Sequence, residues 1–273
     1  MIKLLIFGPT GSMGKLVSKL VLEDKDIDVV AACDVKNIGE KLANIVGTSD
    51  PNKIEITDIK NLREVIIGTS PDVAVDFTIA AATEKNCMIC AENGIRCVIG
   101  TTALSKEFLD KFEVEIKKNQ SPSVISPNMA TGVNVLFKMV SILTTYLAEW
   151  DIEIIESHHH RKADVPSGTA LVIGKTICET LGCDPEETLK FGRSYGPNER
   201  KVGAKNEIGV HAIRAGDIVG DHTILFAGKG ERIELKHQAH SRNSFASGAI
   251  RAIKFIVKQK ENKIFEMKDV LNL

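Results

Sequence analysis

The chain has 273 residues, of which 43% are hydrophobic and 26% are charged, and its formal net charge at pH 7 is -1. These values are typical of a globular protein with one large domain or two modest ones. A balanced net charge disfavours non-specific binding to nucleic acid, which needs a surplus of basic side chains. No apolar run reaches the roughly 18 residues of a membrane-spanning helix, so we expect neither a nucleic-acid nor a membrane partner.

Six cysteines lie mostly in apolar stretches, and the N-terminus shows no signal peptide. Both observations predict reduced thiols and a cytoplasmic location. Cys87 and Cys90 form a CxxC pair, but no second pair and no suitably spaced histidine pair completes a zinc site. We therefore interpret these two cysteines as buried helix residues.

The N-terminal half alternates between short apolar strands and helices. Strands are expected at 3–7, 28–33, 73–76, 97–100 and 123–126, with helices at 13–21, 80–93 and 105–119 between them. Each strand is closed by Gly, Asp, Thr or Asn. This pattern is typical of a parallel, doubly wound sheet that binds its ligands at the carboxyl ends of its strands.

The pattern changes near residue 127. A helix at 133–147, a strand at 151–156, a helix at 170–181, strands at 208–213, 222–227 and 232–240, and an amphipathic helix at 244–258 follow, before a short tail. The longer strands alternate in polarity, which predicts an antiparallel or mixed sheet with one covered face. The polar, glycine-rich stretch 195–209 is expected to be a mobile loop.

A glycine turn joins the first strand to the first helix. Gly8, Gly11 and Gly14 follow a GxxGxxG spacing, and glycine lets such a turn pack tightly while a pyrophosphate approaches the helix N-terminus. Asp34 follows about 20 positions later, where an acid accepts hydrogen bonds from the adenosine ribose. Lys36 can meet a 2′-phosphate, so NAD and NADP both stay open. The alternative is a structural turn with a solvated Asp34.

A dense basic cluster, residues 158–162 (HHHRK), leads to a predicted helix start at Ser167-Gly168-Thr169. Histidine exchanges protons near neutral pH, and lysine donates a proton or holds a carboxylate. The unpaired N–H groups of a helix start favour a carboxylate. Pro166 restricts the approach of the chain, and Asp164 is expected to orient Lys162 or to cap the turn.

Strand alternation would place His158 and His160 on one face of the chain and His159 and Arg161 on the other. Adjacent residues on a strand do not converge on one ion, and no Cys or carboxylate partner stands at ligand spacing, so we expect no metal. The alternative to a functional site is that this cluster is a basic loop exposed to solvent.

Together these motifs resemble the dihydrodipicolinate reductase family, also called 4-hydroxy-tetrahydrodipicolinate reductases. The resemblance runs through residues 8–14 (GPTGSMG), 76–78 (DFT), 100–102 (GTT), 126–129 (SPNM), 156–170 (ESHHHRKADVPSGTA), 214–222 (RAGDIVGDH) and 241–242 (SR). It therefore covers nearly the whole chain.

The resemblance implies an α/β protein with a parallel-sheet Rossmann domain, residues 1–128 and 242–273. It also implies a central α+β domain with a mixed sheet, residues 129–241, which binds substrate and builds a homotetramer. The implied reaction uses NADH or NADPH to reduce hydroxy-tetrahydrodipicolinate, a cyclic dicarboxylate, to tetrahydrodipicolinate in diaminopimelate and lysine biosynthesis. Water is lost from the hydroxylated ring along the way.

The resemblance also assigns roles to residues. It makes His158 the acid/base residue and Lys162 the proton donor, and it places His159, Gly168 and Thr169 on the substrate. The residues implied to line the cofactor are Gly8, Pro9, Thr10, Gly11, Ser12, Met13, Asp34, Gly100, Thr101, Thr102, Ser126, Pro127, Asn128 and Met129. No metal ligand is implied.

Two positions depart from the family pattern. Val165 stands where the family usually has Ala, which is a conservative change. Val35 follows Asp34 where some members carry an Arg that helps to bind NADP. The second departure favours NAD or dual use over strict NADP dependence.

Two other interpretations compete with this one. A reductase of the aspartate-semialdehyde or homoserine type has a similar plan, but a semialdehyde dehydrogenase needs a nucleophilic cysteine in its substrate domain. Cys178 and Cys183 flank the end of a predicted helix, which is a poor place for a nucleophile. A non-catalytic nucleotide sensor would keep the glycine turn, yet it would need no basic cluster beside a carboxylate-binding helix start.

Overall fold

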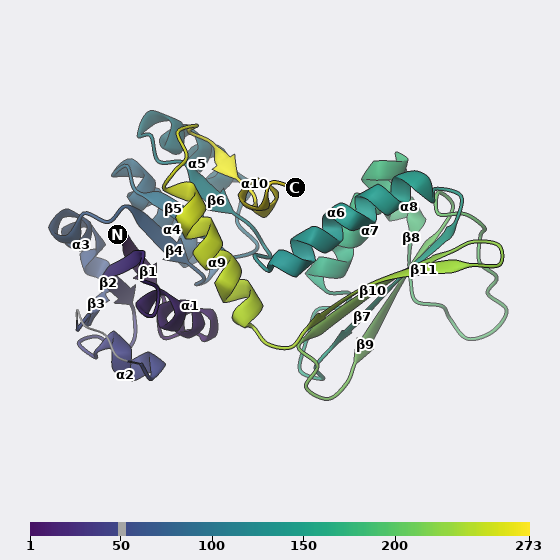
Figure 1. Ribbon diagram of the computed structural model, residues 1–273, viewed down its shortest axis with the longest axis horizontal. Helices are drawn as coiled ribbons and strands as arrows, with labels where there is room; N and C mark the ends of the chain where they lie inside the picture. The colour runs from purple at the N-terminus through teal and green to yellow at the C-terminus, as the bar shows by residue number, and fades with distance from the viewer. Residues whose placement is uncertain (49–52) are drawn as a thin grey trace. The chain divides into compact units, whose positions relative to one another are not determined.

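The computed structural model describes residues 1–48 and 53–273, which divide into two compact units (Figure 1). Unit 1 comprises Met1–Thr131 and Arg242–Leu273, and unit 2 comprises Gly132–Ser241. Unit 1 contains a parallel sheet with helices and unit 2 a mixed sheet. The predicted fold class is confirmed.

Unit 1 is built on a seven-stranded sheet. Its strands are β1 (Ile2–Phe7), β2 (Ile27–Asp34), β3 (Ile56–Asp58), β4 (Val73–Asp76), β5 (Arg96–Ile99), β6 (Ser123–Ile125) and β12 (Ile264–Phe265). Their order in the sheet is β12-β6-β5-β4-β1-β2-β3, and every pairing is parallel. Because β1 lies between β2 and β4, the strand order reverses there, and ligands of such sheets bind beside that reversal.

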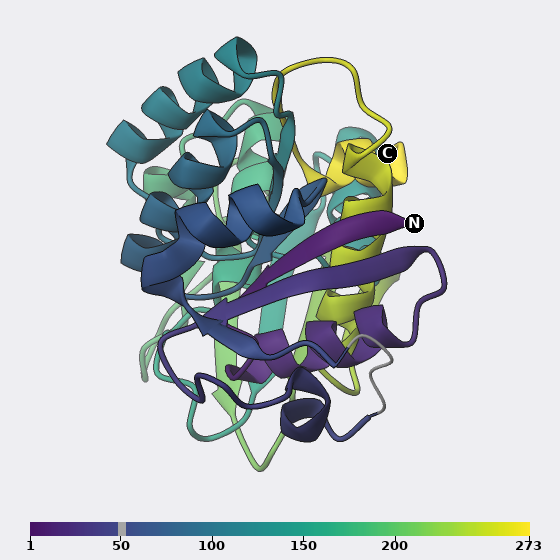
Figure 2. The same ribbon diagram turned by 90° about the vertical axis from the view of Figure 1, so that its left-hand side faces the viewer.

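Helices lie on both faces of this sheet (Figure 2). They are α1 (Ser12–Leu22), α2 (Leu42–Val46), the 3₁₀ turn η1 (Ile59–Asn61), α3 (Leu62–Thr69), α4 (Ala80–Glu92), α5 (Lys106–Lys118), α9 (Asn243–Ile256) and α10 (Met267–Leu271). Leu4 and Ile6 pack on the α1 and α9 side, whereas Leu5 and Phe7 pack on the α3, α4 and α5 side. Alternate side chains of β1 therefore pack into two separate hydrophobic cores, one on each face of the sheet.

The C-terminal segment is more ordered than the expected short tail. Ile264 and Phe265 form β12, which pairs with Ser123 and Val124 at the edge of the sheet, and α10 follows directly. A two-residue strand is too short to show any periodicity in the sequence, so only the pairing with β6 reveals it.

Unit 2 is built on a five-stranded mixed sheet. Its elements are α6 (Thr131–Tyr146), β7 (Asp151–His158), α7 (Gly168–Leu181), α8 (Pro185–Thr188), β8 (Leu189–Phe191), β9 (Ile208–Arg214), β10 (Gly220–Ala227) and β11 (Arg232–Ala239). The order is β11-β10-β7-β9-β8, with β10 antiparallel to β7 and β11, and β9 parallel to β7 and β8.

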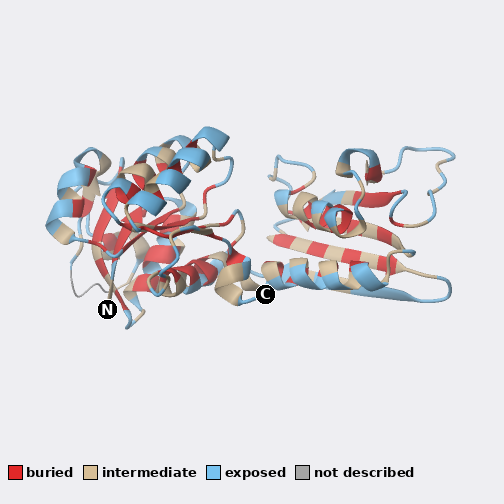
Figure 3. Ribbon diagram, turned by 90° about the horizontal axis from the view of Figure 1, so that it is seen from above, coloured by how far each residue is buried: buried red, intermediate tan, exposed pale blue. Residues whose placement is uncertain are grey.

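Strand β7 explains how this sheet positions polar groups. Buried and half-buried residues alternate along β7 and along the neighbouring β10, and Figure 3 shows this banding in unit 2. Ile152 and Ile154 pack with residues of α6 and α7 in one core. The strand continues two residues beyond the expected Glu156 end, so Glu156 and His158 point to the same covered face.

The polar stretch predicted as a loop has no helix or strand between β8 and β9, up to Glu207. It is anchored, however, because Arg193 and Arg200 both pair with Glu207 and with Glu153 of β7. Its mobility stays a prediction. In the part of the chain that the structure describes, no helix is long and apolar enough to cross a membrane.

Candidate functional site

The glycine turn closes as the sequence predicts. The N–H of Gly11 donates to the carbonyl oxygen of Gly8 at 3.1 Å, and Gly8 has a φ of +63°. A Cβ on Gly14 would lie 2.0 Å from the Gly8 oxygen, so only glycine allows α1 to start this close to β1. Among the described residues, no side chain caps α1 and no acid lies in its first turn. The turn therefore fits an anion such as a pyrophosphate.

Asp34 is tied to this turn. Its Oδ2 accepts hydrogen bonds from the N–H and the hydroxyl of Thr10, at 3.1 and 2.7 Å, and its Oδ1 accepts from the N–H groups of Val35 and Lys36. Only 9% of the residue is exposed. The picture of a solvated Asp34 is therefore wrong. The carboxylate is fixed at the end of β2, beside the helix start.

The remaining cofactor candidates follow β5 and β6. A Cβ on Gly100 would overlap the ring of Phe77, 2.0 Å from its Cε1. The hydroxyl of Ser126 donates to the carbonyl oxygen of Asn128 at 2.9 Å, which tightens the second turn. Met129 is buried in the core of unit 1, and its carbonyl oxygen lies close to Gly248 of α9.

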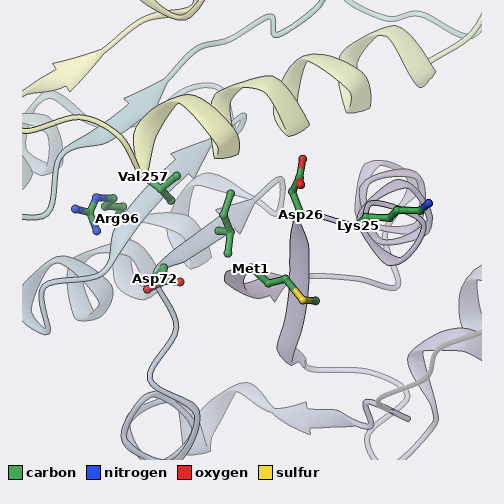
Figure 4. A pocket seen from close by; sticks show the side chains of 7 residues that line it. Met1, Lys25, Asp26, Asp72, Arg96 and Val257 are labelled. Atoms are coloured by element: carbon green, nitrogen blue, oxygen red, sulfur yellow. The ribbon is translucent and has the colours of Figure 1, made fainter.

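Unit 1 thus gathers the predicted cofactor residues at the carboxyl ends of β1, β2, β5 and β6. An open hollow of about 440 Å³ lies at the opposite, amino-terminal ends of the strands (Figure 4). It is lined by Met1, Ile2, Lys25, Asp26, Asp72, Arg96 and Val257. None of these is a predicted site residue, and parallel sheets bind their ligands at the other end.

The catalytic candidate of unit 2 is His158, the last residue of β7. It is largely buried, and its Nδ1 lies 2.6 Å from Oε2 of the fully buried Glu156. Arg214, its register partner on β9, donates from Nη1 and Nη2 to both Glu156 oxygens at 2.8 Å. The N–H of Ser167 donates to Glu156 Oε1 at 3.0 Å.

These contacts determine the charge of Glu156. Burial acts to raise its pKa, but the hydrogen bonds from Arg214, His158 and Ser167 outweigh it and lower the pKa below the usual value. A carboxylate only accepts hydrogen bonds, so Nδ1 of His158 carries the proton toward it. The other ring nitrogen, Nε2, is then the one that can exchange a proton with a substrate.

Lys162 lies beyond the end of β7. Its Nζ donates to both oxygens of Asp164, at 2.7 and 2.8 Å, and this bond lowers the pKa of Asp164. Arg214 donates to the carbonyl oxygens of Lys162 and Asp164. Arg214 therefore holds both the segment from Lys162 to Asp164 and the Glu156 carboxylate that pairs with His158. Asp164 orients Lys162, which is one of the two roles expected for it.

The strand-alternation prediction for the basic cluster is wrong beyond His158. The strand ends at that residue, because the chain turns away and the N–H of His160 donates to the carbonyl oxygen of Gly216 at 3.2 Å. His160 and Arg161 are exposed, and His159 is half-buried.

Helix α7 begins where the sequence places the carboxylate site. Ser167 caps it by accepting from the N–H of Ala170 at 3.2 Å. Gly168 is exposed and has open space where a Cβ would point, and Thr169 is half-buried. The first N–H groups of a helix have no acceptor inside it, so this end suits a carboxylate.

A buried histidine completes the network. His222 of β10 lies edge-on to His158, with ring centroids 5.3 Å apart, and its Nε2 is 3.1 Å from Oγ of Ser167. Burial and the neighbouring charge of His158 lower the pKa of His222 to about 4. His222 therefore stays neutral at pH 7, packs against the ring of His158 and lies within hydrogen-bond distance of the Ser167 hydroxyl.

Sequence reasoning treated Glu156, Arg214 and His222 only as parts of motifs and gave them no role. Glu156 could have been found, because it stands two residues before His158 on the same strand face. Arg214 and His222 lie more than 50 residues further along, and only the pairing of β7 with β9 and β10 brings them to the site.

Cysteine and metal chemistry find no support in the geometry. All six cysteines are free thiols. Cys178 is buried in α7, and burial together with Cys183 raises its pKa to about 12, so it is no candidate nucleophile. Among residues 1–48 and 53–273, no group of three or more His, Cys, Asp or Glu side chains is placed to hold a metal ion.

The fold and the two sets of residues define a class of protein: a two-unit, nicotinamide-dependent reductase with a Rossmann-type unit. Comparison with known families makes the class specific. The family model for the N-terminus of dihydrodipicolinate reductase matches residues 2–129. The family model for the C-terminus of dihydrodipicolinate reductase matches residues 132–271. The chain belongs to the dihydrodipicolinate reductase family.

Curated relatives agree over the full length. The 4-hydroxy-tetrahydrodipicolinate reductase of Methanothermobacter thermautotrophicus is 42% identical, covering 100% of both chains. The enzyme of the same name from Methanocaldococcus jannaschii is 44% identical, covering 100% of this chain and 98% of its own. The expectations of an NAD(P)H-dependent reductase and of a nicotinamide cofactor are confirmed, and nothing favours a nucleotide sensor.

Solved structures extend the comparison. A dipicolinate-bound dihydrodipicolinate reductase from Paenisporosarcina sp. TG-14 superposes with a TM-score of 0.78 at 29% identity, covering 97% of each chain. An aspartate semialdehyde dehydrogenase from Vibrio cholerae reaches a TM-score of 0.55 at 10% identity, covering 94% of this chain and 98% of its own, which shows a shared fold alone.

Proposed function

We propose that this protein reduces hydroxy-tetrahydrodipicolinate to tetrahydrodipicolinate with NADH or NADPH, in diaminopimelate and lysine biosynthesis. The observation that carries the proposal is the pairing of His158 with the ionised, buried Glu156 within 11 residues of the α7 N-terminus. A proton-exchanging group and a carboxylate-binding helix start then belong to one short segment. The names of the full-length relatives support the same reaction.

The residues of unit 2 supply protons and hold the substrate. The bound cofactor supplies the hydride, and the negative charge that hydride addition builds on the ring must be met by a proton. His158 Nε2 acts as the acid/base atom, with Glu156 fixing the orientation of the ring. Lys162 donates a proton from Nζ when the substrate displaces Asp164 as its partner.

The α7 N-terminus holds one substrate carboxylate. The backbone N–H groups of Gly168 and Thr169 and the hydroxyl of Thr169 face it, and His159 contributes a further polar contact. The dipicolinate named with the Paenisporosarcina structure is a dicarboxylate of this kind, which supports the assignment.

The cofactor lies along the carboxyl ends of the unit 1 strands. The turn formed by Gly8, Pro9, Thr10, Gly11, Ser12 and Met13 holds the pyrophosphate, and Asp34 accepts from the adenosine ribose. Gly100, Thr101 and Thr102 after β5, and Ser126, Pro127, Asn128 and Met129 after β6, line the remainder. Lys36 beside Asp34 leaves NADPH acceptable as well as NADH.

Unit 2 also carries the proposed assembly surface of a homotetramer. Val135, Met139, Ile142 and Tyr146 are exposed at helical spacing along α6. Such an apolar stripe favours burial against another protein surface.

A cytoplasmic location is proposed because all six cysteines are free thiols, as in a reducing compartment.

The decisive experiment follows oxidation of NADH and of NADPH by the purified protein, with substrate generated in place by the upstream synthase. Oxidation that depends on the synthase product supports the proposal, and the two rates give the cofactor preference. Absence of oxidation in folded protein that binds nucleotide would overturn it. Lys162→Met should lower kcat roughly 100-fold or more, whereas Lys175→Met, an exposed change on α7, should not.

A further inference from the structure

A buried carboxyl group in unit 1 remains outside the proposed machinery. Asp76, the last residue of β4, is completely buried. Its Oδ1 accepts from the N–H and the hydroxyl of Thr78, both at 2.7 Å, and from the hydroxyl of Thr83 at 2.9 Å. Its Oδ2 is buried and, among the described residues, has no hydrogen-bond partner.

The cluster extends to the turn after β5. The hydroxyl of Thr83, in the first turns of α4, lies 2.8 Å from that of Thr101 and 3.1 Å from that of Thr78, and Thr101 also lies 3.4 Å from Asp76 Oδ1. The backbone carbonyl of Asp76 accepts from the N–H of Gly100 at 2.9 Å. One residue thus ties together the ends of β4 and β5 and the start of α4.

The same cluster reaches the glycine turn after β1. A Cβ built on Gly8 would lie 2.5 Å from the methyl group of Thr78, so this methyl packs directly on the Gly8 backbone. The ring of Phe77 fills the corresponding place against Gly100. Two segments of the proposed cofactor site are therefore held through residues adjacent to Asp76.

A buried carboxyl group without a cationic partner is costly, and a Val or Leu would fill the end of β4 without that cost. Burial raises the pKa of Asp76 although the hydrogen bonds from Thr78, Thr83 and Thr101 oppose the shift. The hydrogen bonds that Oδ1 accepts offset part of the free-energy cost of burying this carboxyl group.

The strand order indicates which part of a dinucleotide these segments would meet. The order is β2-β1-β4-β5, with Asp34 at the end of β2 and the glycine turn at the end of β1. A dinucleotide lies across this strand reversal. With the adenosine ribose at β2 and the pyrophosphate at β1, the nicotinamide half extends toward β4 and β5, where Thr101 and Thr78 stand.

We propose that Asp76 is a positioning residue for the nicotinamide half of the cofactor. It acts through Oδ1, which fixes Thr78 and Thr101, and it does not touch the cofactor itself. The inference rests on the proposed use of NADH or NADPH. It predicts a larger effect at the nicotinamide end than at the glycine turn, because Thr78 touches that turn through its methyl group alone and Asp34 also holds the turn through Thr10.

The test compares dissociation constants for NADH and for ADP-ribose, which lacks the nicotinamide, measured by calorimetry. Asp76→Ala and Thr101→Val should each weaken NADH binding roughly threefold to tenfold, the effect of one lost hydrogen bond. ADP-ribose binding should stay within about twofold of wild type, and the double variant should lose little more than the weaker-binding single variant.

Two further variants sharpen the result. Asp76→Asn keeps the Oδ1 acceptor and should retain NADH binding. Asp72→Asn removes a carboxylate at the opposite end of the same strand, where it accepts from the N–H of Lys3 at 2.8 Å, and should change neither constant. If Asp76→Ala fails to fold, Thr83→Val carries the test, because Thr83 is buried, donates to Asp76 Oδ1 and lies outside the proposed cofactor lining.

Equal losses of NADH and ADP-ribose binding would overturn the inference, because a loosened fold affects both ligands. Unchanged binding of both would also overturn it, as would an Asp76→Asn variant as impaired as Asp76→Ala. These outcomes are separate from the proposed function, which depends on turnover of the synthase product by the wild-type protein. A wild type that turns over, with no split among the variants, refutes only the role of Asp76.

Discussion

The two candidate sites are built in different ways. In unit 1 the turn depends on backbone packing, because a Cβ on Gly14 would lie 2.0 Å from the Gly8 oxygen and only glycine fits there. In unit 2 a network of side chains, Glu156, Arg214 and His158, lies beside the capped start of α7. Backbone sites depend on close approach, and side-chain sites depend on partners brought from distant strands.

This difference predicts different failures. A substitution in the turn should damage binding and folding together, because the backbone itself must move. A substitution in the network of unit 2 should separate turnover from cofactor binding, because the proposed proton-exchanging group belongs to a unit with its own core. Matched variants in each unit can break or sharpen this distinction.

The largest effect is expected at His158. His158→Gln should lower kcat roughly 10²- to 10⁴-fold, since it removes the group that we propose exchanges the proton, while the dissociation constant for NADH stays unchanged. Steady-state kinetics and calorimetry measure the two quantities. His160→Gln is the matched control, because His160 is exposed and its ring contacts, among the described residues, the Gly216 carbonyl and Arg161. Full activity in His158→Gln would remove His158 from the mechanism.

The next effect is expected at Glu156, whose loss leaves the mostly buried Arg214 without its carboxylate partner. Glu156→Gln should destabilise unit 2 by about 3 kcal/mol, the usual cost of breaking a buried ion pair, and should also lower kcat. Urea unfolding followed by the fluorescence of Trp150, the one tryptophan of the chain, reports this unit. Glu179→Gln, an exposed change on α7, should leave the midpoint unchanged. Equal stability of both variants contradicts the network.

A substitution in unit 1 tests the backbone side of the comparison. Gly14→Ala forces Cβ against the Gly8 oxygen, so it should cost about 2 kcal/mol or more of stability and abolish tight NADH binding. Gly68→Ala in α3 meets nothing within 4 Å and should be neutral or slightly stabilising, since alanine favours helices. Circular dichroism and NADH titration distinguish the two. Normal NADH binding by Gly14→Ala would show that the turn tolerates a side chain.

The smallest effect concerns pH. The folded pKa of His222, about 4, lies below the value of roughly 6.5 in an unfolded chain. The unfolded state therefore binds the proton first as the pH falls below 6.5, and stability is lost down to about pH 4. The loss at pH 5 relative to neutral pH is about 2 kcal/mol. Trp150-detected unfolding of wild type and His222→Gln at both pH values measures it. If the free energy of unfolding of the wild type changed between the two pH values by no more than that of His222→Gln, a neutral, buried His222 would be contradicted.

Local patterns were sufficient for much of unit 1. The spacing of Gly8, Gly11 and Gly14, a strand before them and a helix after them together require a tight turn, because only glycine lets the backbone segments touch. Asp34 at the end of the second strand follows from the same reasoning. The cluster around Asp76 could not be predicted in this way, because Thr83 lies on α4 and Thr101 follows β5, and only the fold brings both to Asp76.

In unit 2 the sequence pointed to candidate reacting groups and missed the residues that hold them. His158, Lys162 and the helix start at Ser167 lie within one short segment, so their residue types and order point to proton exchange beside a carboxylate. The end of β7 could not be placed, and the expected orientation of His160 was wrong, because the Gly216 carbonyl draws the chain away from the strand.

The sequence by itself determined the alternating strands and helices of unit 1, the glycine turn and the presence of a basic cluster before a helix start, because each depends on residues close together in the chain. Only the tertiary structure decided the charge state of Glu156, the neutrality of His222, the burial of Asp76 and the pairing of the C-terminal β12. Burial and strand register set these properties, and both arise from contacts between residues far apart in sequence.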